Sequence, residues 1–255
     1  MSTPTIEQIH LHASVRKYKP DPLPKSLVDL IVSSGQRGST SSNLQSYCVV
    51  AVTGRSKKDR LAELCANQEH IRQAPVFLAW CVDLSRLDTA CNLRGYEQVT
   101  DYVENFLVAA MDVAIAMQTA TLAAESLGLG MCYIGAIRNH PAEVIQLLEL
   151  PRLVFPVSGM TLGWPAVEPK PKPRLPLSVV LHWESYSQVG EVEALREYDR
   201  LMAETGIYEG RQVSKPGIEG EVEMYGWLEH TARRISRPIR PGLREVLEDQ
   251  GFDLK

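Results

Sequence analysis

The sequence predicts a mixed α+β fold. Short runs rich in β-branched residues, typical of buried strands, occur in irregular order with longer amphipathic or apolar segments typical of helices. No Gly-x-Gly-x-x-Gly sequence follows any of the predicted strands, which disfavours a Rossmann dinucleotide-binding domain. The chain has 255 residues, enough for one large domain or two small ones with a sizeable core.

The predicted strands are short apolar runs bounded by turn residues. Residues 46–53, with the sequence SYCVVAVT, are rich in β-branched side chains, and residues 76–84 form a similar run. Further strands are predicted at residues 131–137, 154–164 and 177–186. The last two flank a proline-rich connector, whose simplest interpretation is a flexible or polyproline linker.

The longest predicted helix covers residues 98–127 and is apolar on almost every side. We therefore expect a central helix that is buried on most faces and ends with Gly128 at its C′ position. Its alanine content also suits an oligomer interface. Shorter helices are predicted at residues 3–10, 27–34, 57–67 and 141–150.

The tail from residue 190 differs in character from the rest of the chain. It predicts three charged helices, at about residues 191–204, 221–235 and 241–251. Their apolar surface is too small for a core of their own, so we expect the tail to wrap around another surface. The predicted division is a core of residues 1–186 and a helical extension of residues 187–255.

Composition excludes several classes of function. The formal net charge is −4 and 23% of the residues are charged, which gives no electrostatic case for binding nucleic acid or an anionic membrane. No basic stretch followed by an apolar run marks a secretion signal, and no uninterrupted apolar run has the length of a membrane span. The five cysteines form no Cys-x-x-Cys pair, which favours reduced buried thiols, no metal site and a cytoplasmic location.

Three separated elements carry groups that suit an anion. His12, Ser14 and Arg16 form a basic N-terminal cluster, and a hydroxyl-rich loop follows Gly38. Lys172 and Arg174 add cations in the proline-rich connector. Loop N–H groups, hydroxyls and cations together suit a phosphate, so we expect a bound phosphorylated cofactor.

Several short motifs recur in an order that resembles the nitroreductase superfamily of FMN-dependent enzymes. The set is most similar to the oxygen-insensitive NADPH nitroreductase and flavin reductase branch. The resemblance covers about residues 5–186. The motifs are His12-x-Ser14-x-Arg16, Ser39-Thr40-Ser41-Ser42, Gln68-x-His70, Glu125-Ser126-Leu127-Gly128-Leu129-Gly130, Tyr133-Ile134-Gly135, Leu162-Gly163-Trp164-Pro165 and Lys172-Pro173-Arg174-Leu175-Pro176.

The resemblance implies a three-layer fold with a mainly antiparallel central sheet, and a homodimer with FMN at the interface. The helical extension would clasp the partner subunit. The implied contacts divide between the phosphate and ribityl chain, the isoalloxazine ring, and the strand end beside the ring. The phosphate and ribityl chain would contact His12, Ser14, Arg16, Lys172 and Arg174. The isoalloxazine ring would contact Ser39, Thr40, Ser41 and Gln68. The strand end beside the ring is Tyr133, Ile134 and Gly135.

The sequence departs from this branch at several places, among them Asn43, which replaces a more apolar residue. Residue 13 is alanine where the branch commonly has arginine, so one phosphate contact is expected to be missing. The loop that reads the 2′-phosphate of NADPH in relatives contains a single arginine here, Arg211. Arg237 is a further candidate for contact with the substrate or the nicotinamide. NADPH is favoured over NADH as cosubstrate, and the cation near flavin N1 is Lys172, Arg174 or Lys19.

The resemblance implies a reductase that transfers hydride in a ping-pong cycle from NAD(P)H, through FMN, to nitroaromatics, quinones or free flavin. The flavin carries the chemistry, so no protein residue is expected to be catalytic. The expected partners are small planar electron acceptors and a second copy of the chain. The alternatives are a flavin-remodelling or dehalogenating enzyme of the same superfamily, and a module that stores or senses FMN without turnover.

Overall fold

The computed structural model describes residues 2–255 and divides the chain into two compact units. The first unit contains the residues up to 171 together with residues 242–255. The second unit contains residues 172–241. These units do not coincide with a division after residue 186, so a core of 1–186 and an extension of 187–255 stay a prediction about the folding domains.

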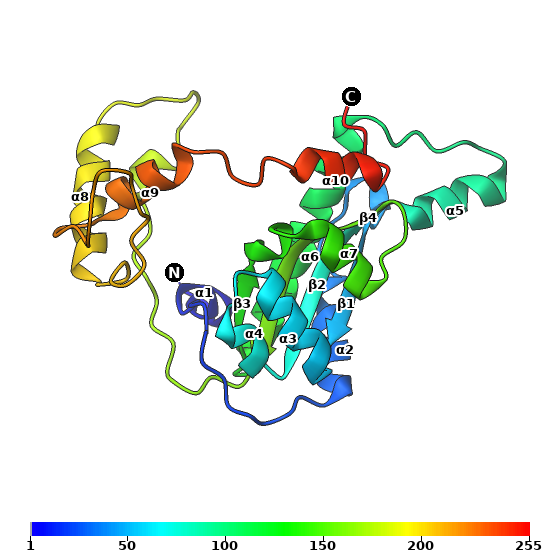
Figure 1. The fold of residues 1–255 in the computed structure, drawn as a ribbon, viewed down its shortest axis with the longest axis horizontal. Coiled ribbons are helices and arrows are strands. Elements are labelled where there is room, and N and C mark those ends of the chain that lie inside the picture. Colours follow the sequence, from blue (N-terminus) through cyan, green and yellow to red (C-terminus); the bar gives the residue numbers. More distant parts are fainter. Residues whose placement is uncertain (1) are drawn as a thin grey trace. The chain divides into compact units, whose positions relative to one another are not determined.

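A four-stranded sheet forms the centre of the first unit (Figure 1). Its strands pair in the order β1-β2-β4-β3, and every pairing is antiparallel. This confirms four of the five predicted strands and the expected sheet type. The strands are β1 (Tyr47–Val52), β2 (Val76–Asp83), β3 (Gly130–Ile134) and β4 (Val154–Gly163).

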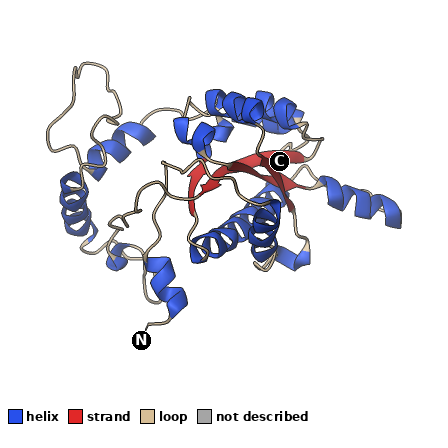
Figure 2. Cartoon of the chain, turned by 90° about the horizontal axis from the view of Figure 1, so that it is seen from below, coloured by secondary structure: helices blue, strands red, loops and turns tan. Residues whose placement is uncertain are grey.

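Helices cover both faces of this sheet, which gives three layers (Figure 2). β2 is buried along its whole length, and its side chains alternate between the two faces, as a strand requires. One face packs against α2 (Lys25–Gly35), α6 (Val103–Ser126) and residues of α10 (Leu243–Asp249). The other packs against α3 (Arg55–Leu64), α4 (Glu69–Gln73) and α7 (Pro141–Leu148).

The long helix α6 differs from its prediction, although Gly128 does follow it in the left-handed conformation. One side packs small residues such as Ala109, Ala116 and Ala120 against the sheet. The opposite side exposes a stripe of apolar residues spaced four apart: Val103, Leu107, Met111 and Ile115. The prediction of burial on most faces was therefore wrong, because the helix covers the sheet with one side only. By length and composition it is the single membrane-span candidate found among residues 2–255.

Two further helices of the first unit lie outside its layers. α1 (Pro4–His10) begins at a Thr3 cap, as predicted. α5 (Ser85–Arg94) was not predicted, and it contains no buried residue, so it lacks the apolar periodicity that would have revealed it. α4, with five residues, is too short to show that periodicity.

The last helix of the tail belongs to the first unit, contrary to the expectation that the whole tail wraps another surface. Leu247 and Phe252 are buried in the core on the α6 side of the sheet, and the rings of Phe252 and Phe106 meet edge to face at 5.5 Å. The Leu153 N–H donates to the Gln250 carbonyl at 2.8 Å. Residues 242–255 thus complete the core of their own chain.

The second unit is built on α8 (Glu191–Glu204) and α9 (Trp227–Ile235), which pack together through Tyr198 and Trp227. The predicted strand at residues 177–186 is wrong. A single 3₁₀ turn, Leu177–Val179, occurs there, and the Leu181 N–H bonds back to the Leu177 carbonyl. A strand needs a neighbour for its backbone groups, and the described residues of this unit provide none.

Candidate functional site

The predicted phosphate-binding segment, residues 12–16, alternates between buried and more exposed side chains. Ala13 and Val15 are buried, whereas His12 and Ser14 are half-buried and Arg16 is exposed. This alternation places the three predicted ligands on one side, as expected for extended backbone. Ala13 lies on the other side, so the direction of its side chain does not support the expected loss of a phosphate contact at this position.

Close packing against β3 and β4 fixes this segment. The Val15 N–H donates to the Met131 carbonyl at 2.8 Å, and the Tyr18 hydroxyl bonds to the Val15 carbonyl and the Thr161 hydroxyl. Burial raises the pKa of Tyr18, which keeps this hydroxyl protonated as a donor. A Cβ atom on Gly130 would lie only 2.4 Å from Val15, so the segment requires glycine there.

Glu125, near the end of α6, holds the imidazole of His12. The Glu125 Oε1 atom lies 2.6 Å from His12 Nδ1, and only 8% of the Glu125 side chain is exposed. A carboxylate on Nδ1 orients the ring and leaves Nε2 as the nitrogen available to a ligand. The contact joins the phosphate segment to the long helix.

Asp112 of α6 anchors both ends of the hydroxyl-rich loop. Its two carboxylate oxygens accept the N–H groups of Ser41 and Ser46 at 3.0 and 3.2 Å, and the residue is 1% exposed. Between these anchors, Ser42, Asn43 and Gln45 adopt the left-handed conformation. The charge-assisted bonds offset the cost of that backbone. Ser39 and Ser41 are exposed and Thr40 is half-buried, so this loop presents its hydroxyls outward.

The other predicted ring contacts lie on the opposite layer and at the end of β3. Gln68 is half-buried, and its amide donates to the Cys65 carbonyl at 2.8 Å. Tyr133 packs toward α6, where its hydroxyl bonds to Thr121 and Gln118, and Ile134 is buried on the other face. The strand ends at Ile134, and a 3₁₀ turn begins at Gly135. The strand end therefore offers backbone, rather than these two side chains, to a ligand.

The remaining predicted residues belong to the second unit. Arg174 is exposed, and its guanidinium donates to the carbonyls of Lys172 and Pro173 at 3.3 and 3.4 Å. Arg211 and Arg237 are also exposed. These cations are accessible to an anion, but the roles predicted for all four residues stay predictions.

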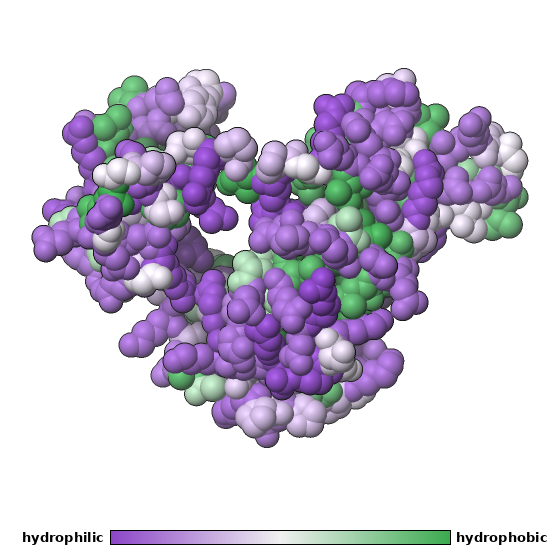
Figure 3. Space-filling model, viewed as in Figure 1, coloured by the Kyte–Doolittle hydropathy of each residue, from purple (hydrophilic) through white to green (hydrophobic). Residues whose placement is uncertain are grey.

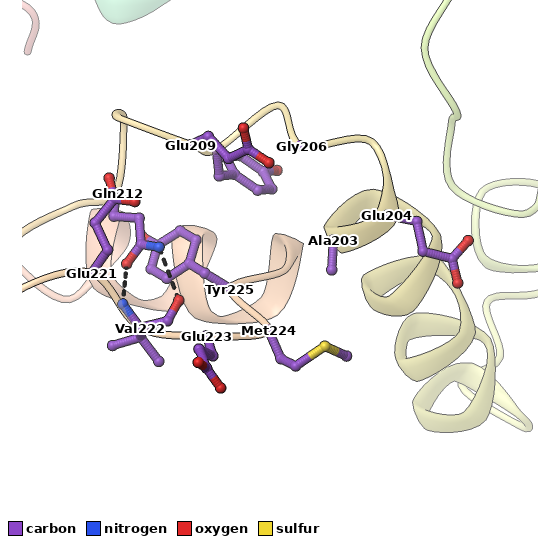
Figure 4. Close-up of a pocket in the computed structure, with 11 residues that line it drawn as sticks. Ala203, Glu204, Gly206, Glu209, Gln212, Glu221, Val222, Glu223, Met224 and Tyr225 are labelled. Carbon is purple, nitrogen blue, oxygen red and sulfur yellow. Dashed lines mark hydrogen bonds between the residues drawn. The ribbon is translucent and has the colours of Figure 1, made fainter.

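A pocket of about 350 Å³ lies in the second unit, beside the loop that contains Arg211 (Figure 4). Gln212 spans one side of it through two hydrogen bonds with the backbone of Val222, at 2.8 and 2.9 Å. Four carboxylates line the pocket, from Glu204, Glu209, Glu221 and Glu223. Their charge makes the pocket itself unsuitable for the 2′-phosphate of NADPH.

The sequence did not reveal the roles of Asp112 and Glu125. Asp112 had one available signal, because it is a lone carboxylate in the middle of an apolar helix, and such groups are buried only with partners. Glu125 stood within a recognised motif, but its partner His12 is 113 residues away. The partners of these two carboxylates could not be predicted from the sequence, because they are distant along the chain.

Comparison with known proteins identifies the family. The Nitroreductase family model matches residues 11–164, and the model of the Nitroreductase family C-terminal domain matches residues 172–255. "FMN reductase [NAD(P)H]" of Bacillus subtilis is 38% identical over 253 residues, and "Oxygen-insensitive NADPH nitroreductase" of Salmonella typhimurium is 34% identical over 250 residues. Each alignment covers 98% of both chains.

Solved structures agree with this result. The "hypothetical oxidoreductase YcnD from Bacillus subtilis" superimposes with a TM-score of 0.91 at 37% identity and covers 100% of both chains. The "NADPH:FMN oxidoreductase from Vibrio harveyi complexed with NAD+" has a TM-score of 0.85 at 31% identity, with 99% of this chain and 100% of that chain covered. The order of motifs, the three-layer fold and these matches agree, and the chain belongs to the nitroreductase family.

Proposed function

We propose that the protein is an FMN-dependent NAD(P)H oxidoreductase that reduces nitroaromatics, quinones or free flavin. Relatives named FMN reductase, NADPH nitroreductase and NADPH-flavin oxidoreductase align over nearly the whole chain and support this activity. The structural observation that carries the proposal is the face formed by His12, Ser14 and Arg16, which a backbone hydrogen bond of Val15 joins to β3 and which is partly exposed.

The residues of this face fit the phosphate end of FMN. A phosphate needs hydrogen-bond donors and positive charge. The imidazole of His12, the hydroxyl of Ser14 and the guanidinium of Arg16 supply both from one side of the segment. The hydrogen bonds of Val15 with Met131 and Tyr18 fix the backbone between these groups, which lowers the cost of ordering them around a ligand. We further propose that Lys172 and Arg174 add charge to the phosphate, as the resemblance implies.

When bound, FMN supplies the hydride chemistry, accepting from a nicotinamide and delivering to the acceptor in a ping-pong cycle. The residues of the chain bind and orient. Arg16 neutralises the phosphate, and Glu125 fixes the His12 ring. Asp112 holds the loop of Ser39, Thr40 and Ser41, which we propose contacts the ring together with Gln68. The end of β3, Tyr133-Ile134-Gly135, would border the ring through its backbone.

The apolar stripe on α6 supports a homodimer. Val103, Leu107, Met111 and Ile115 expose between 42% and 54% of their surface, and such a stripe on a long helix normally meets another surface. The loop held by Asp112 begins beside this stripe, because Ile115 packs near Gly38. A partner seated on the stripe would thus receive that loop, which supports a flavin ring site shared between subunits. We also propose that the part of the extension before residue 242 clasps the partner, since residues 242–255 pack in the core of their own chain.

NADPH is the proposed cosubstrate, because several relatives are named for NADPH. Arg211 and Arg237 are the proposed contacts for the nicotinamide cosubstrate or the acceptor. Steady-state kinetics with NADPH and NADH side by side test this choice, and equal efficiency would show that Arg211 does not select the 2′-phosphate. A cytoplasmic location is proposed from the five free cysteines, because reduced thiols are typical of that compartment.

The first test of the activity is spectroscopic. The purified protein should be yellow, with a flavin absorbance near ~450 nm. NADPH should bleach it without oxygen, and a nitroaromatic should restore the colour. A protein that binds FMN but is bleached by neither nicotinamide would instead be a storage or sensor module. Bleaching without reoxidation by nitroaromatics, quinones or free flavin would favour the flavin-remodelling or dehalogenating alternative.

The phosphate assignment is tested by Arg16→Ala and Arg174→Ala. Each change removes a charge-assisted contact worth about 1.5–3 kcal/mol, so the affinity for FMN should fall at least about tenfold. Titration of the apoprotein by quenching of FMN fluorescence measures the change. Arg94→Ala, at an exposed position of α5, is the matched control. Unchanged affinity in both arginine variants would refute the assignment.

A further inference from the structure

A cavity in the first unit lies against the N-terminal segment that contains His12, Ser14 and Arg16, none of which lines it. Its volume is about 280 Å³. The buried side chain of Ala13 lines it, together with Leu11 and Pro165. Because Ala13 is so small, the side of the segment that faces this cavity is left unfilled. Of the side chains that line this cavity, only that of Glu125 has a role in the proposed flavin site, where it orients His12.

Glu125 provides the cavity with a carboxylate that is incompletely paired. Its side chain is 8% exposed and lines the cavity. The Oε1 atom is bound to His12, whereas the buried Oε2 atom accepts no hydrogen bond from any part of the chain that the structure describes. A buried carboxylate oxygen without a donor is costly, and rotation about the terminal torsion of glutamate is soft enough to present either oxygen.

The other polar groups of the cavity have matching chemistry. Glu168 adds a second carboxylate at the exposed rim, and Gln8 adds an amide. Among the described residues that line the cavity there is no lysine, arginine or histidine. The cavity therefore has two carboxylates, an apolar wall and no cationic side chain in its lining. Such a cavity favours a ligand that brings a positive charge and N–H donors.

We propose that this cavity is a binding site for a small organic cation, a guanidinium or primary ammonium group on a short apolar stem. The cationic head donates to Glu125 and Glu168, and the stem lies against Leu11 and Ala13. A guanidinium suits it best, because its planar fork of donors pairs with carboxylates in two parallel hydrogen bonds. This site touches the proposed flavin site through the side chain of Glu125, whose other oxygen holds His12. Binding of the cation does not require reductase activity.

The probe that tests the site is methylguanidinium, with methylurea as a neutral control of nearly the same shape. Saturation-transfer NMR on the FMN-loaded protein should show binding of methylguanidinium at millimolar concentration and none of methylurea. Glu125→Gln should weaken binding at least about tenfold, because it removes the buried charge. Glu168→Gln, at the exposed rim, should weaken it about two- to fivefold without disturbing the fold.

Ala13→Arg fills the cavity from within, so it should abolish methylguanidinium binding and raise the melting temperature by satisfying Glu125. Ala90→Arg, at an exposed position of α5, is the control and should retain binding. Equal signals from methylguanidinium and methylurea would overturn the proposal. So would binding that persists unchanged in Ala13→Arg, or in both glutamine variants.

Discussion

Two buried carboxylates of α6 organise the predicted binding residues. Asp112 joins the ends of the hydroxyl-rich loop, and Glu125 orients His12. The sequence predicted which residue types would face a flavin, because hydroxyls, cations and amides appear in a recognisable order. It could not predict which carboxylates support them, since each support depends on a tertiary contact between distant segments.

Replacement of Asp112 tests the first support. Asp112→Asn keeps the size of the side chain but replaces one accepting oxygen by an NH₂ group that faces the N–H of Ser41 or Ser46. The loss of one charge-assisted bond and the clash of donors should lower the free energy of unfolding by about 1–3 kcal/mol. The affinity for FMN should fall as well. Asp29→Asn, at an exposed site on α2, is the control in both urea denaturation and FMN titration; equal effects of the two changes would contradict the anchoring role.

The cysteines give a prediction that depends on pH. Burial raises the pKa of the Cys65 thiol to about 12, and a hydrogen bond with Cys48 together with burial raises that of Cys81 well above its ordinary value. In the native protein at about pH 8, Ellman's reagent should therefore react only with the half-exposed Cys48 and Cys91. All five thiols should react in denaturant. Fast native labelling of Cys65 would contradict the buried environment.

The same shift affects stability in alkaline solution. Between the ordinary thiol pKa of 9.0 and about 12, the unfolded chain has released the Cys65 proton while the folded chain retains it. Proton release then favours the unfolded state, so stability should fall as the pH rises through this window. Urea denaturation at several pH values measures the slope. Cys65→Ala should make it shallower, and Cys91→Ser should leave it unchanged.

At the scale of elements, prediction succeeded where the local pattern and the tertiary environment agree. Residues 76–84 read as a buried strand, and β2 is buried on both faces between its two neighbours. Residues 177–186 also contain a short run of valine and leucine, but no strand lies beside them among the described residues of their unit. The helix α5 was not predicted for the opposite reason. It has no buried face, so its sequence lacks the regular spacing of apolar residues that identifies a helix.

The contact between the phosphate segment and β3 can be tested through Gly130. In Gly130→Ala, the new Cβ would lie 2.4 Å from Val15 and 3.0 Å from Pro165, so the segment must shift. We expect stability to fall by about 1–3 kcal/mol, as for other overpacked sites. The affinity for FMN should fall too, because His12, Ser14 and Arg16 move with the segment. Gly54→Ala is the matched control, since a Cβ there meets no atom within 4 Å; FMN affinity lost equally in both variants would exclude the steric explanation.

At the scale of the whole molecule, a single chain leaves apolar surface uncovered. The stripe on α6 is one part, and Leu177, Trp183 and Tyr186 of the second unit are another. Apolar side chains also reach the surface on the face that Figure 3 shows. The sequence indicated an oligomer interface on the long helix but predicted burial of that helix within its own chain. The spacing of apolar residues along a helix shows which faces are apolar. It does not show whether the same chain or a partner subunit covers each face.

The stripe therefore provides a test of the proposed dimer. Met111→Glu places a charge at the centre of the stripe, where Met111 is 49% exposed in the single chain. The change costs the monomer little, because the side chain points into solvent, but burial of an unpaired carboxylate in an interface opposes association. Light scattering coupled to size-exclusion chromatography should show a shift from dimer to monomer, and FMN should be lost in parallel if the loop near Ser41 completes the partner's ring site. Ile6→Glu, at an exposed position of α1, should leave the dimer intact. A monomer that keeps FMN at wild-type affinity would show that each chain binds the flavin alone.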